Sequence, residues 1–429
     1  MILLIAVFIT IAYIFLVVKS IQAKKWLHFL PSSTWFSIMV VPYILHLTWA
    51  NQSFTNSQGW GIFIVFFFLI SGDFCGQRFY KDPSAEMKVV DPGRVLRIIA
   101  YLCVLLIPLV HFLIARQIPI LHLFDAPESI PSLSSRREEF SKLATYPYIF
   151  KVFPNLYFTL IAPLALAFCY KMKYKMSFAF LMAWSIFYSV SSSAEFSILI
   201  LISMTVFGIT FSQGLRSLSL VKLLAFLSLS ATIASGVAVE SELLANPQQC
   251  LPRVQTYTSV ADKFRVCREL NHVIVNSVVD RIGYRVFLTP IDVSSWWYKY
   301  YLSNPHRSVG SLISRDLNYQ PSNIIGRVAY FDRFPNSYLE SVSAYSSLDA
   351  DAFSFGWIFL WVSAFLVFLM RILAGLGLVS KYFFVRTLAG ILFGGLIIFP
   401  FTASIQAILI AQGLALPFIL LFVLVKKTT

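Results

Sequence analysis

Long apolar runs constrain this chain more than any other feature of its sequence. A helix needs about 20 mostly apolar residues to cross the ~30 Å hydrocarbon layer of a membrane. About eleven stretches approach that length: residues 1–18, 34–50, 60–76, 98–115, 154–170, 176–191, 195–212, 222–239, 354–372, 384–400 and 402–425. Only 13% of the residues are charged, against roughly 25% in soluble domains. The sequence therefore predicts an all-α polytopic membrane protein.

The distribution of Lys and Arg predicts how these helices are oriented. Positively charged loops resist translocation and stay on the cytoplasmic side. If Met1 faces outward, cations and acids balance on the outer side, and the formal net charge of +14 is an excess on the inner side. The basic composition then reflects topology, and we assign no nucleic-acid partner. We expect the amino terminus outside and the carboxyl terminus inside.

This topology divides the chain into three parts. Residues 1–239 hold the first membrane helices and a smaller outer loop at 116–153. Residues 240–353 form a large outer loop, and residues 354–429 hold the last membrane helices. Loops of such length usually have a function, so the outer side is where we expect the functional residues.

The large loop contains a segment with helical periodicity, from residue 271 to residue 288. We expect an amphipathic helix there that Pro290 ends. Arg281 and Arg285 would be one turn apart on one face of it. Five aromatic residues follow, for which an interfacial belt is a better interpretation than a sugar-stacking platform: Trp296, Trp297, Tyr298, Tyr300 and Tyr301.

Two cysteines, Cys250 and Cys267, also lie in the large outer loop. In an oxidising exterior they would form a disulfide; two unrelated free thiols are the alternative interpretation.

Signatures of soluble enzymes are absent from the sequence, which has no GxxxxGK[ST] phosphate loop, GxGxxG, CxxC, HExxH or GxSxG motif. Asp349 and Asp351 form an Asp-Ala-Asp triplet, a spacing with which some glycosyltransferases hold a divalent ion. A three-residue pattern of this kind arises easily by chance. We therefore assign no metal site and expect no cofactor.

Two segments of the large loop together suggest a family. The segment "RVFLTP" (Arg285 to Pro290) precedes a Tyr/Trp-rich run, and "AYSSLDADAFSFGWIF" (Ala344 to Phe359) leads into a membrane helix. This order resembles that of the bacterial O-antigen polymerases (Wzy), which carry an Arg-x-Phe-x-x-Pro-like segment and then an Asn-rich, Asp-Ala-aromatic, Phe-Gly-x-x-Gly stretch. The chain departs from the pattern twice, with Ser346 or Ser347 where Asn is usual and Phe359 in place of the second Gly.

The resemblance implies an inner-membrane enzyme with a large, partly helical periplasmic loop and about eleven transmembrane helices, compatible with a GT-C-like architecture. It implies a reaction that transfers a glycan from one undecaprenyl diphosphate to the non-reducing sugar of another lipid-linked unit. The partners would be undecaprenyl-diphosphate-linked oligosaccharides and the lipid bilayer, with a chain-length regulator (Wzz) as a further candidate. The donor's glycosyl phosphate bond supplies the energy, so no nucleotide is needed.

Such a reaction needs cations for the departing diphosphate and a base for the acceptor hydroxyl. Arginine suits the first task because its planar fork binds phosphate oxygens bidentately. The candidates for diphosphate binding are Arg285, Arg281, Arg136, Arg137 and Arg327. The alternative roles of these arginines are salt bridges to nearby acids, such as Glu138 and Glu139, or snorkelling to lipid head groups.

The candidates for the catalytic base are Asp351, Glu340 and His306. Asp351 leads because it lies in the family-like segment. Its alternative role is to cap a helix that starts near Ser354.

Three other functions remain open at this point. An O-antigen ligase uses similar donors, but we would expect a His-Asn pair before the last loop helix, where this chain reads "PNSYLES". A flippase for lipid-linked oligosaccharides would need cations inside the helix bundle, whereas the cations here are expected at the ends of the spans. A non-enzymatic scaffold gives no reason for arginines clustered with acids at the outer surface.

Overall fold

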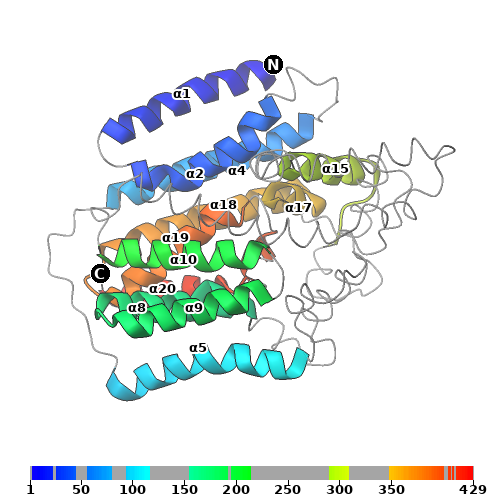
Figure 1. Ribbon diagram of the computed structural model, residues 1–429. Helices are drawn as coiled ribbons and strands as arrows, with labels where there is room; N and C mark the ends of the chain where they lie inside the picture. Colours follow the sequence, from blue (N-terminus) through cyan, green and yellow to red (C-terminus); the bar gives the residue numbers. More distant parts are fainter. Residues whose placement is uncertain are drawn as a thin grey trace, which may run out of the picture.

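The structure is a computed structural model that describes residues 2–22, 26–44, 56–79, 93–115, 154–191, 195–213, 289–308, 347–400, 404–406, 408–409 and 412–428. Within these ranges the regular elements are helices and there is no strand. Most of the helices run along one common direction, and the two chain ends lie at opposite ends of the bundle (Figure 1). The all-helical class predicted from the apolar runs is confirmed for the described residues.

The first half of the bundle starts with α1 (Ile2–Gln22) and a broken helical segment made of η1 (Trp26–Phe29), α2 (Leu30–Trp35) and η2 (Phe36–Val40). Two long helices follow, α4 (Asn56–Phe79) and α5 (Gly93–Ala115). Next come η4 (Tyr157–Ile161), α8 (Ala162–Lys171), α9 (Lys175–Ser191) and α10 (Glu195–Gln213). Helices α1 and α5 lie at the two outer edges of the bundle (Figure 1).

The second half contributes the centre of the bundle and one of its ends. The helices α15 (Thr289–Ser303) and α17 (Leu348–Ser354) are followed by α18 (Trp357–Val379), α19 (Phe383–Ile398) and α20 (Ala415–Thr428). Helix α18 packs along α4, and α19 packs between α18 and α10. In Figure 1, α15 and α17 lie at the end of the bundle that also carries the amino terminus, whereas the carboxyl terminus lies at the other end.

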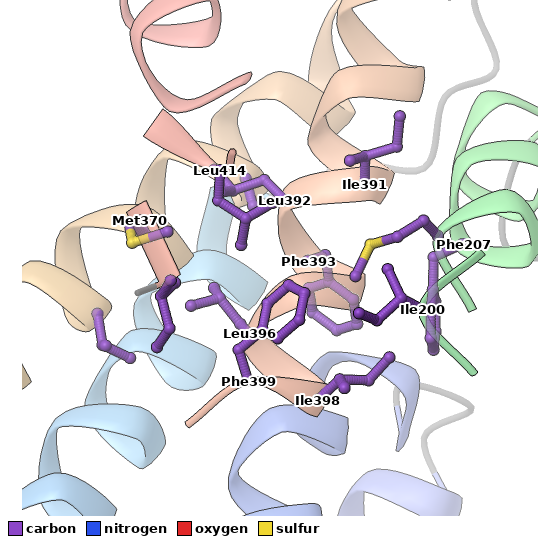
Figure 2. Packing of buried hydrophobic residues seen from close by; sticks show 14 of the residues in the cluster. Ile200, Phe207, Met370, Ile391, Leu392, Phe393, Leu396, Ile398, Phe399 and Leu414 are labelled. Atoms are coloured by element: carbon purple, nitrogen blue, oxygen red, sulfur yellow. The ribbon is translucent and has the colours of Figure 1, made fainter. Parts of the chain in front are cut away.

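The core centres on α19, which is buried along almost its entire length. Phe393, Leu396 and Phe399 pack with Ile200 and Phe207 of α10 (Figure 2). Gly390 and Gly394 allow α19 to approach α10 closely, because a Cβ at either position would overlap Phe207. Small residues at such crossings are typical of helices that associate by van der Waals packing.

Two helices are long and apolar enough to cross a membrane by length and composition, Asn56–Arg78 and Trp357–Val379. Shorter apolar helical stretches occur at Ile9–Ile21, Ala100–Ile114, Ser197–Ser212, Phe383–Ile398 and Ala415–Val425. Most of the apolar runs in the described ranges therefore form helices where the sequence predicts them. The run at 222–239 and the predicted loop 116–153 lie outside the described residues. So do residues 240–288 and 309–346 of the predicted large loop, which include Cys250 and Cys267.

Three expectations about the second half need correction. The run 402–425 is not one helix, because α20 begins only at Ala415, after a turn in which Gly413 has a φ of +72°. Pro290, expected at the end of a helix, is the second residue of α15, in the first turn, where proline costs no hydrogen bond; residues 271–288 lie outside the described ranges. Of the aromatic run, Trp297, Tyr298 and Tyr301 are buried rather than placed in an interfacial belt.

Candidate functional site

Helices α15 and α17 pack against each other at one end of the bundle, and both contact α4. The contact is aromatic: the rings of Tyr298 and Phe353 stack with their centroids 4.4 Å apart. Trp297, Tyr301 and Ala350 complete this small core. The aromatic run of α15 thus serves to hold α17, the helix that carries both Asp349 and Asp351.

Asp349 joins three elements in the interior. Its Oδ2 accepts a hydrogen bond from Ser294 Oγ of α15 at 3.3 Å. Gln58 of α4 donates from Nε2 to the same Ser294 hydroxyl at 3.3 Å and to the Ile291 carbonyl at 3.1 Å. Asp349, Ser294 and Gln58 are fully buried. This chain of hydrogen bonds fixes α15 and α17 relative to α4.

Tyr298 adds to the same junction. Its hydroxyl lies against Gly61 of α4, where a Cβ would overlap it. Burial, followed by the nearby Asp349 carboxylate, raises the pKa of Tyr298 well above its usual range, so the phenol stays neutral. Burial also raises the pKa of Asp349, to about 6, while Ser347 and the amides at the start of α17 oppose that rise.

Asp351 forms an ion pair with Arg307, which follows the end of α15. Arg307 Nη1 lies 3.5 Å from Asp351 Oδ1. The Arg307 backbone amide donates to the Ser354 carbonyl at 2.8 Å, and the guanidinium lies over the Phe355 ring at 4.3 Å. The side chains of Arg307 and Asp351 are only 15% and 10% exposed. Their placement is therefore fixed by backbone, aromatic and ionic contacts together.

The electrostatics of this pair suit proton transfer beside an anion. Burial raises the pKa of the Asp351 carboxyl to about 6, and the positive charge of Arg307 opposes part of that rise. A carboxylate with such a pKa accepts a proton more readily than an ordinary aspartate does. Arg307 Nε is buried and has no hydrogen-bond partner among the described residues, while the Arg307 side chain as a whole is 15% exposed.

His306 lies beside the pair and is exposed. Its ring stands edge-on to Phe353 with centroids 5.2 Å apart and is parallel to the Tyr301 ring at 6.4 Å. The structure therefore gathers His306, Arg307 and Asp351 at the end of the bundle, with Asp349 in the interior behind them. We call Arg307, Asp351 and His306 the outer cluster.

The two aspartates do not converge on one point. Asp349 is hydrogen-bonded to Ser294, whereas Asp351 pairs with Arg307. Residues two apart in a helix point in roughly opposite directions, about 200° around the axis. A single ion bridged by both carboxylates is therefore not the arrangement here. Within the described ranges no group of three or more His, Cys, Asp or Glu side chains is placed to hold a metal ion.

Of the site residues predicted from sequence, Asp351 and His306 lie in the outer cluster. Asp351 does not cap the following helix: it lies inside α17, and α18 begins at Trp357 after Gly356. The other predicted residues lie outside the described ranges: Glu340, Arg281, Arg285, Arg136, Arg137 and Arg327.

Sequence reasoning missed Arg307, Ser294 and Gln58 as members of the site. Arg307 and Asp351 are 44 positions apart, and Gln58 and Ser294 are 236 apart. The one available signal was the position of Arg307 next to His306, just after an aromatic helix.

A second buried ion pair lies within the bundle, away from the outer cluster. Arg371 Nε of α18 donates to Asp73 Oδ1 of α4 at 2.6 Å, and both side chains are fully buried. Arg371 Nη2 donates to the His28 carbonyl at 3.1 Å, and the Ser32 amide donates to Asp73 Oδ2 at 3.1 Å. The expectation that all cations lie at the ends of the apolar helices is therefore wrong for Arg371.

Comparisons with protein-family models, with curated proteins and with solved structures find no match for this chain.

Proposed function

We propose that the protein is a membrane glycosyltransferase that joins undecaprenyl-diphosphate-linked oligosaccharide repeat units into O-antigen or a related polysaccharide. The observation that carries the proposal is the outer cluster, in which Asp351 and Arg307 lie 3.5 Å apart at one end of an apolar helical bundle. Asp351 belongs to the segment that resembles the O-antigen polymerases. A base beside a cation supplies both groups that such a transfer needs.

The proposal includes about eleven membrane spans in the bacterial inner membrane, with the amino terminus and the loops 116–153 and 240–353 on the periplasmic side. It is supported by the two helices of spanning length and by the opposite placement of the chain ends. Apolar side chains are also widely exposed on α1, α5 and α18, among them Phe15, Leu113 and Ile358. Lipid is the solvent in which such exposure is favourable.

In the proposed reaction, Asp351 accepts the proton of the acceptor sugar hydroxyl as its oxygen bonds to the anomeric carbon of the donor. The bond between that carbon and the phosphate oxygen breaks, and undecaprenyl diphosphate leaves with the electron pair. Arg307 stabilises the departing diphosphate, because a guanidinium binds phosphate oxygens through oriented donors.

The predicted diphosphate-binding arginines extend this cation set: Arg281, Arg285, Arg327, Arg136 and Arg137. His306 and Glu340 are the alternative bases. The proposed chemistry assigns the neutralisation of the diphosphate to arginines and requires no cofactor. A chain-length regulator in the same membrane is a proposed partner.

The experiment is a reconstitution of the purified full chain in proteoliposomes with undecaprenyl-diphosphate repeat units. We expect a ladder of longer lipid-linked glycans, which Asp351→Asn abolishes. Lys299→Gln is the matched control, because Lys299 is an exposed cation of α15 whose ammonium lies over the Trp296 ring. A wild-type protein that forms no ladder, or an Asp351→Asn variant with a normal one, contradicts the proposal.

A flippase is the second candidate, because the Arg371–Asp73 pair places charge inside the bundle. Both charges are fully buried against each other and not open to a passing headgroup, which favours the polymerase. The same proteoliposomes separate the functions: a flippase moves lipid-linked units across the bilayer and forms no new bond, and a ligase forms one only when lipid A core is added.

A further inference from the structure

One face of α18 is both exposed and rich in aromatic residues. Trp357, Trp361 and Phe365 follow one another at four-residue intervals and are exposed. Phe68 of α4 lies beside them, with its ring centroid 5.7 Å from Trp361 and 6.1 Å from Phe365. Residues four apart share one helix face, so these four rings form a continuous surface. We call it the aromatic strip.

The aromatic strip extends deeper than an ordinary interfacial belt. Tryptophan belts lie at the level of the lipid head groups. Trp361 and Phe365 lie about 6 Å and 12 Å further along the α18 axis than Trp357. The exposed face of α5, at the edge of the bundle, is aliphatic by contrast: Ile98, Leu102, Leu106, Leu109, Val110 and Leu113. Other helices also expose aromatic residues, such as Phe180 of α9 and Phe422 of α20, so the strip is distinguished by its position next to Phe353, which His306 contacts.

The strip begins at the outer cluster. The Trp357 ring contacts Phe353 with centroids 5.2 Å apart, and His306 contacts the same Phe353 ring at 5.2 Å. Arg307 lies over Phe355, one residue before the Gly356 turn into α18. A molecule with its anionic group at Arg307 would therefore have its apolar tail at the top of the strip.

We propose that the aromatic strip is the docking surface for the polyprenyl chain of the lipid-linked substrate. This inference rests on the proposed function for the identity of that lipid. A polyprenyl chain is unsaturated and carries a methyl branch in each unit, so it presents C–H groups and π bonds to flat aromatic faces along its length. Large aromatic side chains offer apolar area together with a polarised ring face. A straight acyl chain has no π bonds or methyl branches to contact those faces, so it binds them less favourably.

The test measures binding of two probes to the full-length protein in nanodiscs, undecaprenyl monophosphate and a straight-chain alkyl phosphate of similar length. Wild-type protein is expected to bind the polyprenyl probe more tightly. The double variant Trp361→Leu/Phe365→Leu keeps the surface apolar and should lose about tenfold in affinity for the polyprenyl probe. Its affinity for the alkyl probe should change by less than about twofold, because the phosphate site is intact.

Phe15→Leu is the matched control, because Phe15 is an exposed aromatic residue on α1, away from the strip; it should leave both affinities unchanged. Equal binding of the two probes by wild-type protein, or an unchanged polyprenyl affinity in the double variant, overturns the inference. If no glycosidic bond forms in the reconstituted system but the double variant still loses polyprenyl binding, the proposed reaction is wrong and the strip is nevertheless a polyprenyl-binding surface.

Discussion

At the residue scale, the behaviour of the outer cluster depends on two opposed effects on Asp351. Burial raises the pKa of its carboxyl to about 6, and the charge of Arg307 acts in the opposite direction. Because Asp351 must be ionised to accept a proton, the rate of polymerisation should rise with pH up to about 6 and level off above it. Below that pH the rate should fall about tenfold per unit.

Arg307→Gln tests this electrostatic coupling. Removing the positive charge leaves burial unopposed, so the pKa of Asp351 rises and the acidic limb of the pH–rate profile moves to higher pH. The variant should also be slower at every pH, because the leaving diphosphate loses a donor. The pH–rate profile of Lys299→Gln should match that of the wild type. If the midpoint of the acidic limb is unchanged in Arg307→Gln, Asp351 is not the catalytic base.

A second prediction at this scale concerns Arg285, in the segment that resembles the polymerases. Lysine keeps the charge but lacks the bidentate fork. Arg285→Lys should therefore reduce polymerisation by ~10²–10³, as expected for losing an oriented donor to a developing anion. An exposed salt bridge, worth at most about 1 kcal/mol, would not explain that loss. Arg253→Lys is the control, because Arg253 lies in the same loop but outside this segment; it should have almost no effect. If Arg285→Lys is present in membranes at wild-type levels and still builds normal chains, the role of Arg285 is structural.

At the element scale, the turn between α17 and α18 orients the whole cluster. Gly356 N-caps α18 with φ +99° and ψ 170°, a conformation that is essentially restricted to glycine. A Cβ at this position would meet no atom within 4 Å. The requirement for glycine here is therefore conformational rather than steric.

Gly356→Ala should cost about 1–3 kcal/mol through backbone strain and should lower activity by moving α17 relative to α18. Thermal unfolding in detergent together with the polymerisation assay checks both effects. Gly208→Ala is the control, because its Cβ would make an ordinary 3.4 Å contact with Thr387 inside a regular helix. Equal unfolding temperatures and activities for Gly356→Ala and wild type would show that the turn is unstrained.

The same elements show what the sequence can and cannot predict. The apolar period and length of 354–372 located the core of α18 well, because burial in a bundle or a bilayer demands that pattern. Pro290 was interpreted as a helix end, but it lies in the first turn of α15, where proline is tolerated because the amide it lacks would have no partner there. The aromatic run was expected at an interface, and its burial depends on Phe353, more than 50 positions later in the chain.

At the scale of the whole molecule, the Arg371–Asp73 pair ties distant parts of the chain together. Its members are 298 positions apart, so no local pattern could have predicted the contact. The pair bonds the His28 carbonyl and the Ser32 amide as well, and Gly76 lies against the guanidinium, where a Cβ would overlap it. The first broken helix, α4 and α18 are thus joined through one ion pair.

Arg371→Met should destabilise the protein by about 3–5 kcal/mol, because it leaves the Asp73 carboxylate buried without its partner. Asp73→Leu/Arg371→Met should recover much of that loss, since no charge is then buried. Arg78→Met is the control, as Arg78 is exposed and contacts Phe74 through its guanidinium. Thermal unfolding in one detergent compares the variants. If Arg371→Met unfolds at the same temperature as the wild type, the ion pair does not stabilise the bundle.

We propose that the protein itself forms glycosidic bonds by cleaving the donor's glycosyl phosphate bond. The most direct measurement counts, in proteoliposomes containing excess EDTA, the undecaprenyl diphosphate released and the new bonds formed from lipid-linked repeat units. We expect one undecaprenyl diphosphate for each bond, no requirement for Mg²⁺, and neither product from Asp351→Asn. Bond formation that stops in EDTA and returns with Mg²⁺, or no bond formation by the wild-type protein, would contradict it.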